Sequence, residues 1–96
     1  MRLSKYKQEF ITTYWKEKFP NCKIYLFGSR TDDSKQGGDI DILVLNDLAI
    51  DYETKFNFIE NFCEEFGEQR VDLSTFTFDD ETTPFKFIAL HTAIEI

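Results

Sequence analysis

The segment that decides the fold is a run of seven residues near the middle of the chain. It reads Asp39-Ile40-Asp41-Ile42-Leu43-Val44-Leu45. A continuous run of β-branched and apolar residues after a glycine pair is typical of a strand covered on both faces. Because side chains alternate along a strand, Asp39 and Asp41 point to the same side. Two carboxylates on such a strand are costly to bury unless something compensates their charge.

The segments on either side of this strand have the patterns of helices and further strands. Ser4 is a suitable N-cap for a first helix that Pro20-Asn21 ends, and Asp51 can cap a second helix that Gly67 ends. The expected order is helix, strand, strand, helix, strand, helix, strand, over residues 5–19, 23–27, 39–45, 52–66, 70–76, 83–91 and 92–96. Because the strands are few, the helices must cover one face, which predicts a small mixed α/β (α+β) fold with one domain over residues 1–96.

The apolar positions of the first two helices are expected to form the core. In the first helix they are Tyr6, Phe10, Ile11, Tyr14 and Phe19. In the second they are Tyr52, Phe56, Ile59, Cys63 and Phe66, which share one helix face. Neither stripe is expected to bind a cofactor.

The composition excludes several classes of protein. With 42% hydrophobic and 17% aromatic residues, the chain is not disordered. It has no apolar run long enough for a membrane span and begins with polar residues, so we expect a cytoplasmic protein. Cys22 and Cys63 have no metal-site spacing and are expected to be reduced thiols. The net charge of −7 argues against a broad nucleic-acid surface.

A third carboxylate lies in a setting like that of the first two. In Arg70-Val71-Asp72-Leu73, the acid stands between two apolar residues that face the other way. If this strand lies beside the central one, Asp72 can join Asp39 and Asp41 around one or two cations. Carboxylate oxygens suit Mg²⁺ and Mn²⁺, and two such ions support phosphoryl or nucleotidyl transfer. The simpler interpretation of Asp72 is a surface acid paired with Arg70.

A phosphate-binding turn would complete such a site. Gly28-Ser29 follows a predicted strand, where a glycine lets the backbone approach a phosphate and N–H groups attract anions. Arg30 and Lys35 could add positive charge, and Arg30 is the better candidate because it adjoins the turn. The alternatives are an ordinary turn and two solvated side chains. No Walker loop follows Gly28, and the single histidine, His91, does not suffice for a zinc cluster.

Together these segments resemble the nucleotidyltransferase superfamily that includes DNA polymerase β, and more closely its minimal nucleotidyltransferases (MNT). The matching stretches are Leu26-Phe27-Gly28-Ser29-Arg30, Gly38-Asp39-Ile40-Asp41-Ile42 and Val71-Asp72-Leu73. They follow the family pattern in order: a hydrophobic residue, Gly-Ser, a variable gap, Asp-hydrophobic-Asp and a third Asp on a later strand. Two features depart from close relatives: a gap of nine residues between Ser29 and Asp39, and the acids Asp32 and Asp33 within it.

The resemblance implies a fold, a site and a reaction. The fold would be a mixed sheet with helices on one side. Asp39 and Asp41 would bind Mg²⁺, with two ions expected, and Asp72 would complete the site and help to activate the acceptor. Gly28 and Ser29 would hold the β- and γ-phosphates of ATP or another nucleoside triphosphate. An acceptor hydroxyl would attack the α-phosphorus, and pyrophosphate would leave.

The resemblance also implies a partner. Minimal members are often encoded beside a helical HEPN protein, and in some pairs the small protein is an antitoxin that adenylylates a tyrosine of the HEPN toxin. Two other functions stay open. One is a non-catalytic module that neutralises its partner by contact, because residues 36–96 carry fourteen acids against three basic residues. The other is a small-molecule enzyme whose pocket would need a homo-oligomer.

Overall fold

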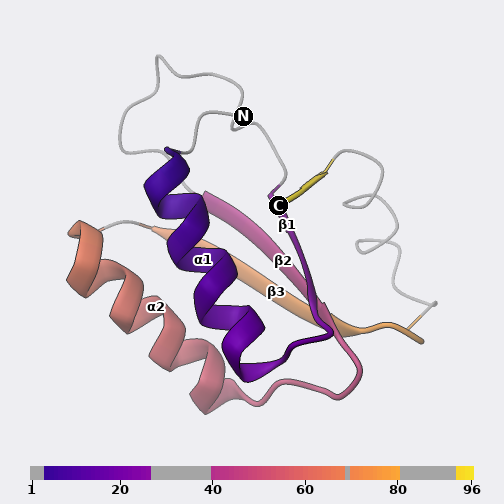
Figure 1. Cartoon of the computed structure of the whole chain (residues 1–96). Coiled ribbons are helices and arrows are strands. Elements are labelled where there is room, and N and C mark those ends of the chain that lie inside the picture. Colours follow the sequence, from indigo (N-terminus) through magenta and orange to yellow (C-terminus); the bar gives the residue numbers. More distant parts are fainter. Residues whose placement is uncertain (1–3, 27–39, 69, 81–92) are drawn as a thin grey trace.

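The described residues form a four-stranded sheet and two helices (Figure 1). The computed structural model describes residues 4–26, 40–68, 70–80 and 93–96. The elements are α1 (Lys5–Lys18), β1 (Lys23–Leu26), β2 (Ile40–Asn46), α2 (Tyr52–Phe66), β3 (Val71–Thr77) and β4 (Ile94–Glu95). Their types and order confirm the prediction, and the helix expected over 83–91 lies outside the described residues. Within those residues, no helix has both the length and the apolar character that a membrane crossing needs.

The predicted central strand lies inside the sheet, whose order is β3-β2-β1-β4. β2 pairs parallel with β3 and antiparallel with β1, so the sheet is mixed as expected. The β2–β3 register runs from Ile40 opposite Val71 to Asn46 opposite Thr77. The backbone N–H of Ile40 also donates to the carbonyl of Arg70 at 2.9 Å, which continues the ladder at the start of both strands. This pairing holds β2 and β3 in register along their whole length.

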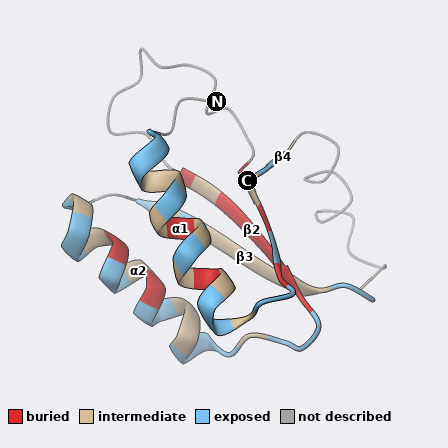
Figure 2. Cartoon of the chain, viewed as in Figure 1, coloured by how far each residue is buried: buried red, intermediate tan, exposed pale blue. Residues whose placement is uncertain are grey.

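β2 is covered on both faces, as its sequence predicts. Ile40, Ile42 and Val44 belong to the core under the helices. Leu43 and Leu45 point the other way and are still buried, with 0% and 5% of their surface exposed. In Figure 2, β2 is drawn mostly in the red of buried residues. A strand without a solvated face needs apolar residues on both sides, which explains the continuous apolar run.

The first helix begins and ends where its caps predict. The Ser4 hydroxyl accepts a hydrogen bond from the Lys7 N–H at 3.2 Å, which satisfies one donor of the first turn. At the other end, the Phe19 N–H donates to the Trp15 carbonyl at 2.8 Å, and Pro20 follows. The caps therefore set the length of α1 before any tertiary contact is considered.

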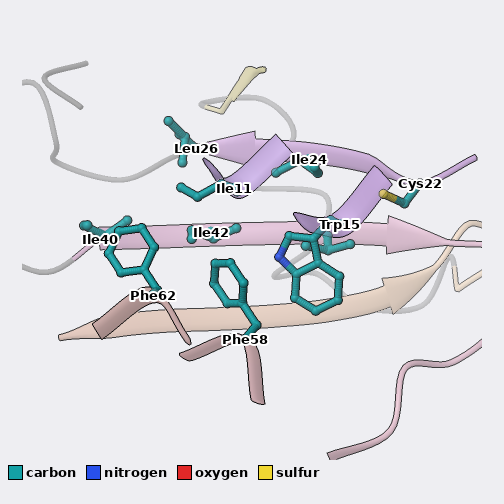
Figure 3. Close-up of a cluster of buried hydrophobic side chains, with 10 residues drawn as sticks. Ile11, Trp15, Cys22, Ile24, Leu26, Ile40, Ile42, Phe58 and Phe62 are labelled. Carbon is teal, nitrogen blue, oxygen red and sulfur yellow. The ribbon is translucent and has the colours of Figure 1, made fainter. Parts of the chain in front are cut away.

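Both helices lie on the same side of the sheet and supply the aromatic half of the core (Figures 1 and 3). The helix residues that reach the strands in Figure 3 are Ile11, Trp15, Phe58 and Phe62. The Phe58 ring lies 5.2 Å from the Trp15 ring, centroid to centroid. Cys22 belongs to the same core, and Cys63 is half-buried.

The predicted inner face of α2 is wrong by part of a turn. Tyr52 and Phe56 are 77% and 46% exposed, whereas Phe58 and Phe62 are fully buried. The sequence of α2 carries two overlapping apolar stripes, and the packing partner on α1 decides between them. Phe58 and Phe62 meet Phe10 and Trp15 of α1, so their stripe turns inward.

The predicted core of α1 also needs two corrections. Tyr6 is 60% exposed, because its hydroxyl reaches across to Glu65 on the surface of α2 and donates a hydrogen bond to that carboxylate. Trp15, which was not among the expected core positions, is fully buried. A large indole fills the space between α1, α2 and the strands better than the residues at the helix ends.

The N-cap of α2 should make stability depend on acid pH. Hydrogen bonds from Thr54 lower the pKa of the Asp51 carboxyl below its ordinary value of 3.8, and the Thr54 side chain contributes more than its backbone N–H. The stabilisation is therefore complete above that ordinary value and is lost as the pH falls through the lower folded-state pKa. Urea unfolding at pH values from 6 down to 2.5 should show that the difference in unfolding free energy between the wild type and Asp51→Asn becomes smaller as the pH falls. The reason is that the amide caps the helix without titrating. A constant difference over this range would contradict the assignment.

Candidate functional site

The structure brings together two acids of the predicted site. Asp41 on β2 and Asp72 on β3 are direct partners in the parallel register. Their neighbours along each strand, such as Ile42 and Leu73, pack into the core under the helices. Because side chains alternate, both carboxylates lie on the opposite face of the sheet. Adjacent strands are about 4.8 Å apart, so one cation can reach both side chains.

The two acids differ in their surroundings. Asp41 is half-buried, whereas 51% of the Asp72 side chain is exposed. The Arg70 Nε lies 3.9 Å from Asp72 Oδ1, so the surface pairing considered from the sequence is also present. With the Arg70 side chain 75% exposed, this pair is strongly screened by water and leaves the carboxylate accessible.

The donor chemistry of this pair fits a magnesium ion. Two neighbouring carboxylates repel each other, and a divalent cation between them offsets that repulsion. Carboxylate oxygens are also the ligands that Mg²⁺ prefers in proteins. Among residues 4–26, 40–68, 70–80 and 93–96, no group of three or more acidic, histidine or cysteine ligands gathers. The described part of the site is therefore a pair of acids, and the third predicted ligand, Asp39, lies outside it.

The predicted phosphate-binding residues also lie outside the described part of the chain. They are Gly28, Ser29 and Arg30, with Lys35 as the weaker candidate. The described strands include the residues that precede and follow them in the sequence. β1 ends at Leu26, which is the register partner of Ile42, and β2 begins at Ile40. Leu26 and Ile40, the described residues before and after this stretch of sequence, therefore lie at the same end of the sheet as Asp41.

Tyr25 is a polar residue of this face that the sequence analysis did not single out. It is the register partner of Leu43 and lies between Ile24 and Leu26, which both face the core. Its side chain is therefore on the same face as Asp41, one strand away. Burial, and then the charge of Glu95, raise the pKa of Tyr25, so its phenol stays protonated and can donate a hydrogen bond. The alternation in Ile24-Tyr25-Leu26 was the signal that could have identified it.

The family model described as a nucleotidyltransferase domain matches residues 10–95 of the chain. The chain belongs to the nucleotidyltransferase domain family. The match includes both strands that carry the acid pair, and it confirms the family expected from the sequence motifs. None of the curated proteins matches this nucleotidyltransferase in sequence.

Several solved structures have the fold of this nucleotidyltransferase. A chain in the complex of a tri-AMPylated Shewanella oneidensis HEPN toxin with an MNT antitoxin is 20% identical, with a TM-score of 0.69, and the match covers 97% of this chain and 71% of that one. A toxin–antitoxin structure with AMP-PNP matches at 21% identity and a TM-score of 0.70, over 92% of this chain and 70% of that one. A third, the toxin–antitoxin MntA-HepT, matches at 19% identity, with a TM-score of 0.69 and 96% and 70% coverage. The expected fold class is therefore confirmed.

Proposed function

We propose that this chain is a Mg²⁺-dependent nucleotidyltransferase that transfers AMP from ATP to a hydroxyl of a HEPN-type partner, and thereby acts as its antitoxin. The observation that carries the proposal is the in-register pairing of Asp41 with Asp72 on the face of the sheet opposite the helices. The likeness to structures of an AMPylated HEPN toxin with its MNT antitoxin, and of a toxin–antitoxin with AMP-PNP, supports the choice of partner and nucleotide.

The three acids have distinct roles in this proposal. Asp39 and Asp41 hold Mg²⁺, and Asp72 completes the site from the neighbouring strand. The metal supplies positive charge that offsets the charge on the phosphates. Asp72 is the more exposed of the two described acids, which suits a group that meets the incoming acceptor. It accepts the proton of the acceptor hydroxyl.

The reaction is a displacement at the α-phosphorus of ATP. The acceptor oxygen forms a bond to this phosphorus, the bond between the phosphorus and the bridging oxygen breaks, and pyrophosphate leaves with that oxygen. Gly28 and Ser29 bind the β- and γ-phosphates through backbone N–H groups and the hydroxyl, and Arg30 adds positive charge. These residues thus hold the leaving group, while the acids act at the reacting phosphate.

A labelling experiment tests the proposal and its dependence on metal. The chain is incubated with ATP labelled in its α-phosphate and with a HEPN-type protein from the same genome. We expect label on the partner with Mg²⁺, none after addition of EDTA, and recovery when Mg²⁺ or Mn²⁺ is restored. If the partner stays unlabelled while the chain binds both ATP and metal, the proposal is wrong.

A second candidate function is neutralisation by contact alone. The exposed acidic side of α2, which carries Glu53, Glu60 and Glu64, favours it because a basic partner could dock there. Co-expression of the partner with Asp41→Asn separates the two functions. An antitoxin that acts by transfer loses its protection while the complex still forms, whereas a contact antitoxin keeps it.

A further inference from the structure

The first two residues of one apolar stripe on α2 are exposed. Tyr52 and Phe56 are 77% and 46% exposed, and their rings stack with centroids 6.4 Å apart and planes 18° from parallel. Ile59 and Cys63, both half-buried, continue the same line at the spacing of successive helix turns, and Ile59 packs against the core. We name the exposed pair, Tyr52 and Phe56, the outer stripe. An ordered pair of exposed aromatic rings is typical of the centre of a protein interface.

Acidic residues border the outer stripe along one side. Glu53, Glu60 and Glu64 are all exposed, and their spacing of seven and four places them on one line of the helix. The only basic residue of α2 is Lys55, which is half-buried. The helix therefore presents an apolar line beside a line of negative charge.

We propose that the outer stripe is the surface on which this chain docks its protein partner, and that the partner offers an apolar recess with a basic rim. The inference rests on the proposed function for the identity of the partner, and it adds the surface and the chemistry of recognition. Aromatic side chains supply the buried contact area, and the glutamates steer a basic protein toward it.

Electrostatic repulsion disfavours a second copy of the chain, a nucleic acid or an anionic membrane as the occupant of this stripe. A second copy related by a two-fold axis would place the same patch opposite itself, so the glutamates would face one another. Nucleic acids and anionic membranes are repelled by a chain with a net charge of −7. A basic protein is the occupant whose charge complements this side of α2.

Docking on the outer stripe would be separate from catalysis. α2 covers one face of the sheet, and Asp41 and Asp72 lie on the other. The acceptor hydroxyl must then come from a part of the partner outside the docked contact. It follows that a chain without transfer activity still holds its partner, and that a chain without the stripe still binds nucleotide.

The test measures binding to a HEPN-type protein from the same genome by titration calorimetry. We expect the double variant Tyr52→Ser/Phe56→Ser to weaken the Kd by about tenfold or more. Phe78→Ser, at an aromatic residue that is 37% exposed beyond the end of β3, is the matched control and should keep the wild-type Kd. Circular dichroism checks that all variants are folded.

A second set of variants tests the charge. Glu53→Gln/Glu60→Gln should slow association and remove much of its dependence on salt. Glu9→Gln/Glu17→Gln on α1, where both residues are exposed, is the matched control. It should leave the association rate and its salt dependence unchanged. Equal salt dependence in the two sets would contradict a basic rim on the partner.

Three results would overturn the inference. They are a wild-type Kd for the double serine variant, no binding of the wild-type chain to the partner, and a self-associated wild-type chain that the double variant makes monomeric. Light scattering on a sizing column detects the last. The proposed function is judged by a different readout, because a wild-type chain that binds the partner, ATP and metal without transferring label defeats that function and leaves the docking surface intact.

Discussion

Replacing Asp41 by Asn is expected to lower the rate of AMP transfer about a thousandfold while the fold stays intact. The amide is a poor ligand for Mg²⁺ and leaves the phosphates without several kcal/mol of charge stabilisation, where each 1.4 kcal/mol is about tenfold in rate. The substitution also removes one of two like charges on neighbouring strands. Transfer activity and the response of the fold to Mg²⁺ are the two properties that this substitution should change.

Label transfer and thermal unfolding, each with and without Mg²⁺, measure these two effects. Mg²⁺ should raise the Tm of the wild type, because a ligand that binds only the folded state stabilises it, and should not raise that of Asp41→Asn. Asp47→Asn is the matched control, since Asp47 is exposed just beyond the other end of β2. An Asp41→Asn chain with wild-type transfer, or with an unchanged response to Mg²⁺, would contradict the metal site.

Replacing Phe58 by Ala is expected to lower the free energy of unfolding by about 3–5 kcal/mol. Phe58 is fully buried, and its ring contacts those of Tyr14, Trp15 and Phe62. Its removal leaves a cavity that the neighbouring aromatic rings are too rigid to fill. Since a domain of this size is stable by about 5–15 kcal/mol, this one substitution should cost a large part of the stability.

The matched control lies two residues away on the same helix. Phe56 is 46% exposed, so Phe56→Ala should change the unfolding free energy by less than about 1 kcal/mol. Urea unfolding followed by fluorescence reports on both variants, because the single tryptophan, Trp15, is buried beside Phe58. If Phe56→Ala proved the more damaging, the inner face of α2 would be the one that its sequence pattern first indicated.

The contrast between these two phenylalanines shows what a sequence pattern can decide. The ends of α1 and α2 were predicted because Ser4 and Asp51 cap their helices through local hydrogen bonds. The rotation of α2 was not predicted, because two apolar stripes overlap along the helix and the packing against Phe10 and Trp15 of α1 decides between them. Information on local structure lies in the segment itself, whereas information on packing lies in a segment distant in sequence.

The same distinction applies to the candidate site. The shared face of the acids followed from alternation along each strand, but their meeting required β3 to lie beside β2, which the sequence analysis could state only as a condition. The register of Asp41 with Asp72 meets this condition. The roles of Asp39, Gly28, Ser29 and Arg30 stay predictions, since these residues lie outside the described part of the chain.

The parallel pairing of β2 and β3 has a consequence for how the two faces communicate. Parallel neighbours cannot be joined by a hairpin, and here α2 is the crossover between them. One strand–helix–strand unit thus carries an acid on each strand and the outer stripe on its helix. A partner bound to the helix and an ion bound between the acids would both favour the same arrangement of this unit. By thermodynamic reciprocity, an ion that holds the two strands together should therefore raise the affinity of the helix for the partner.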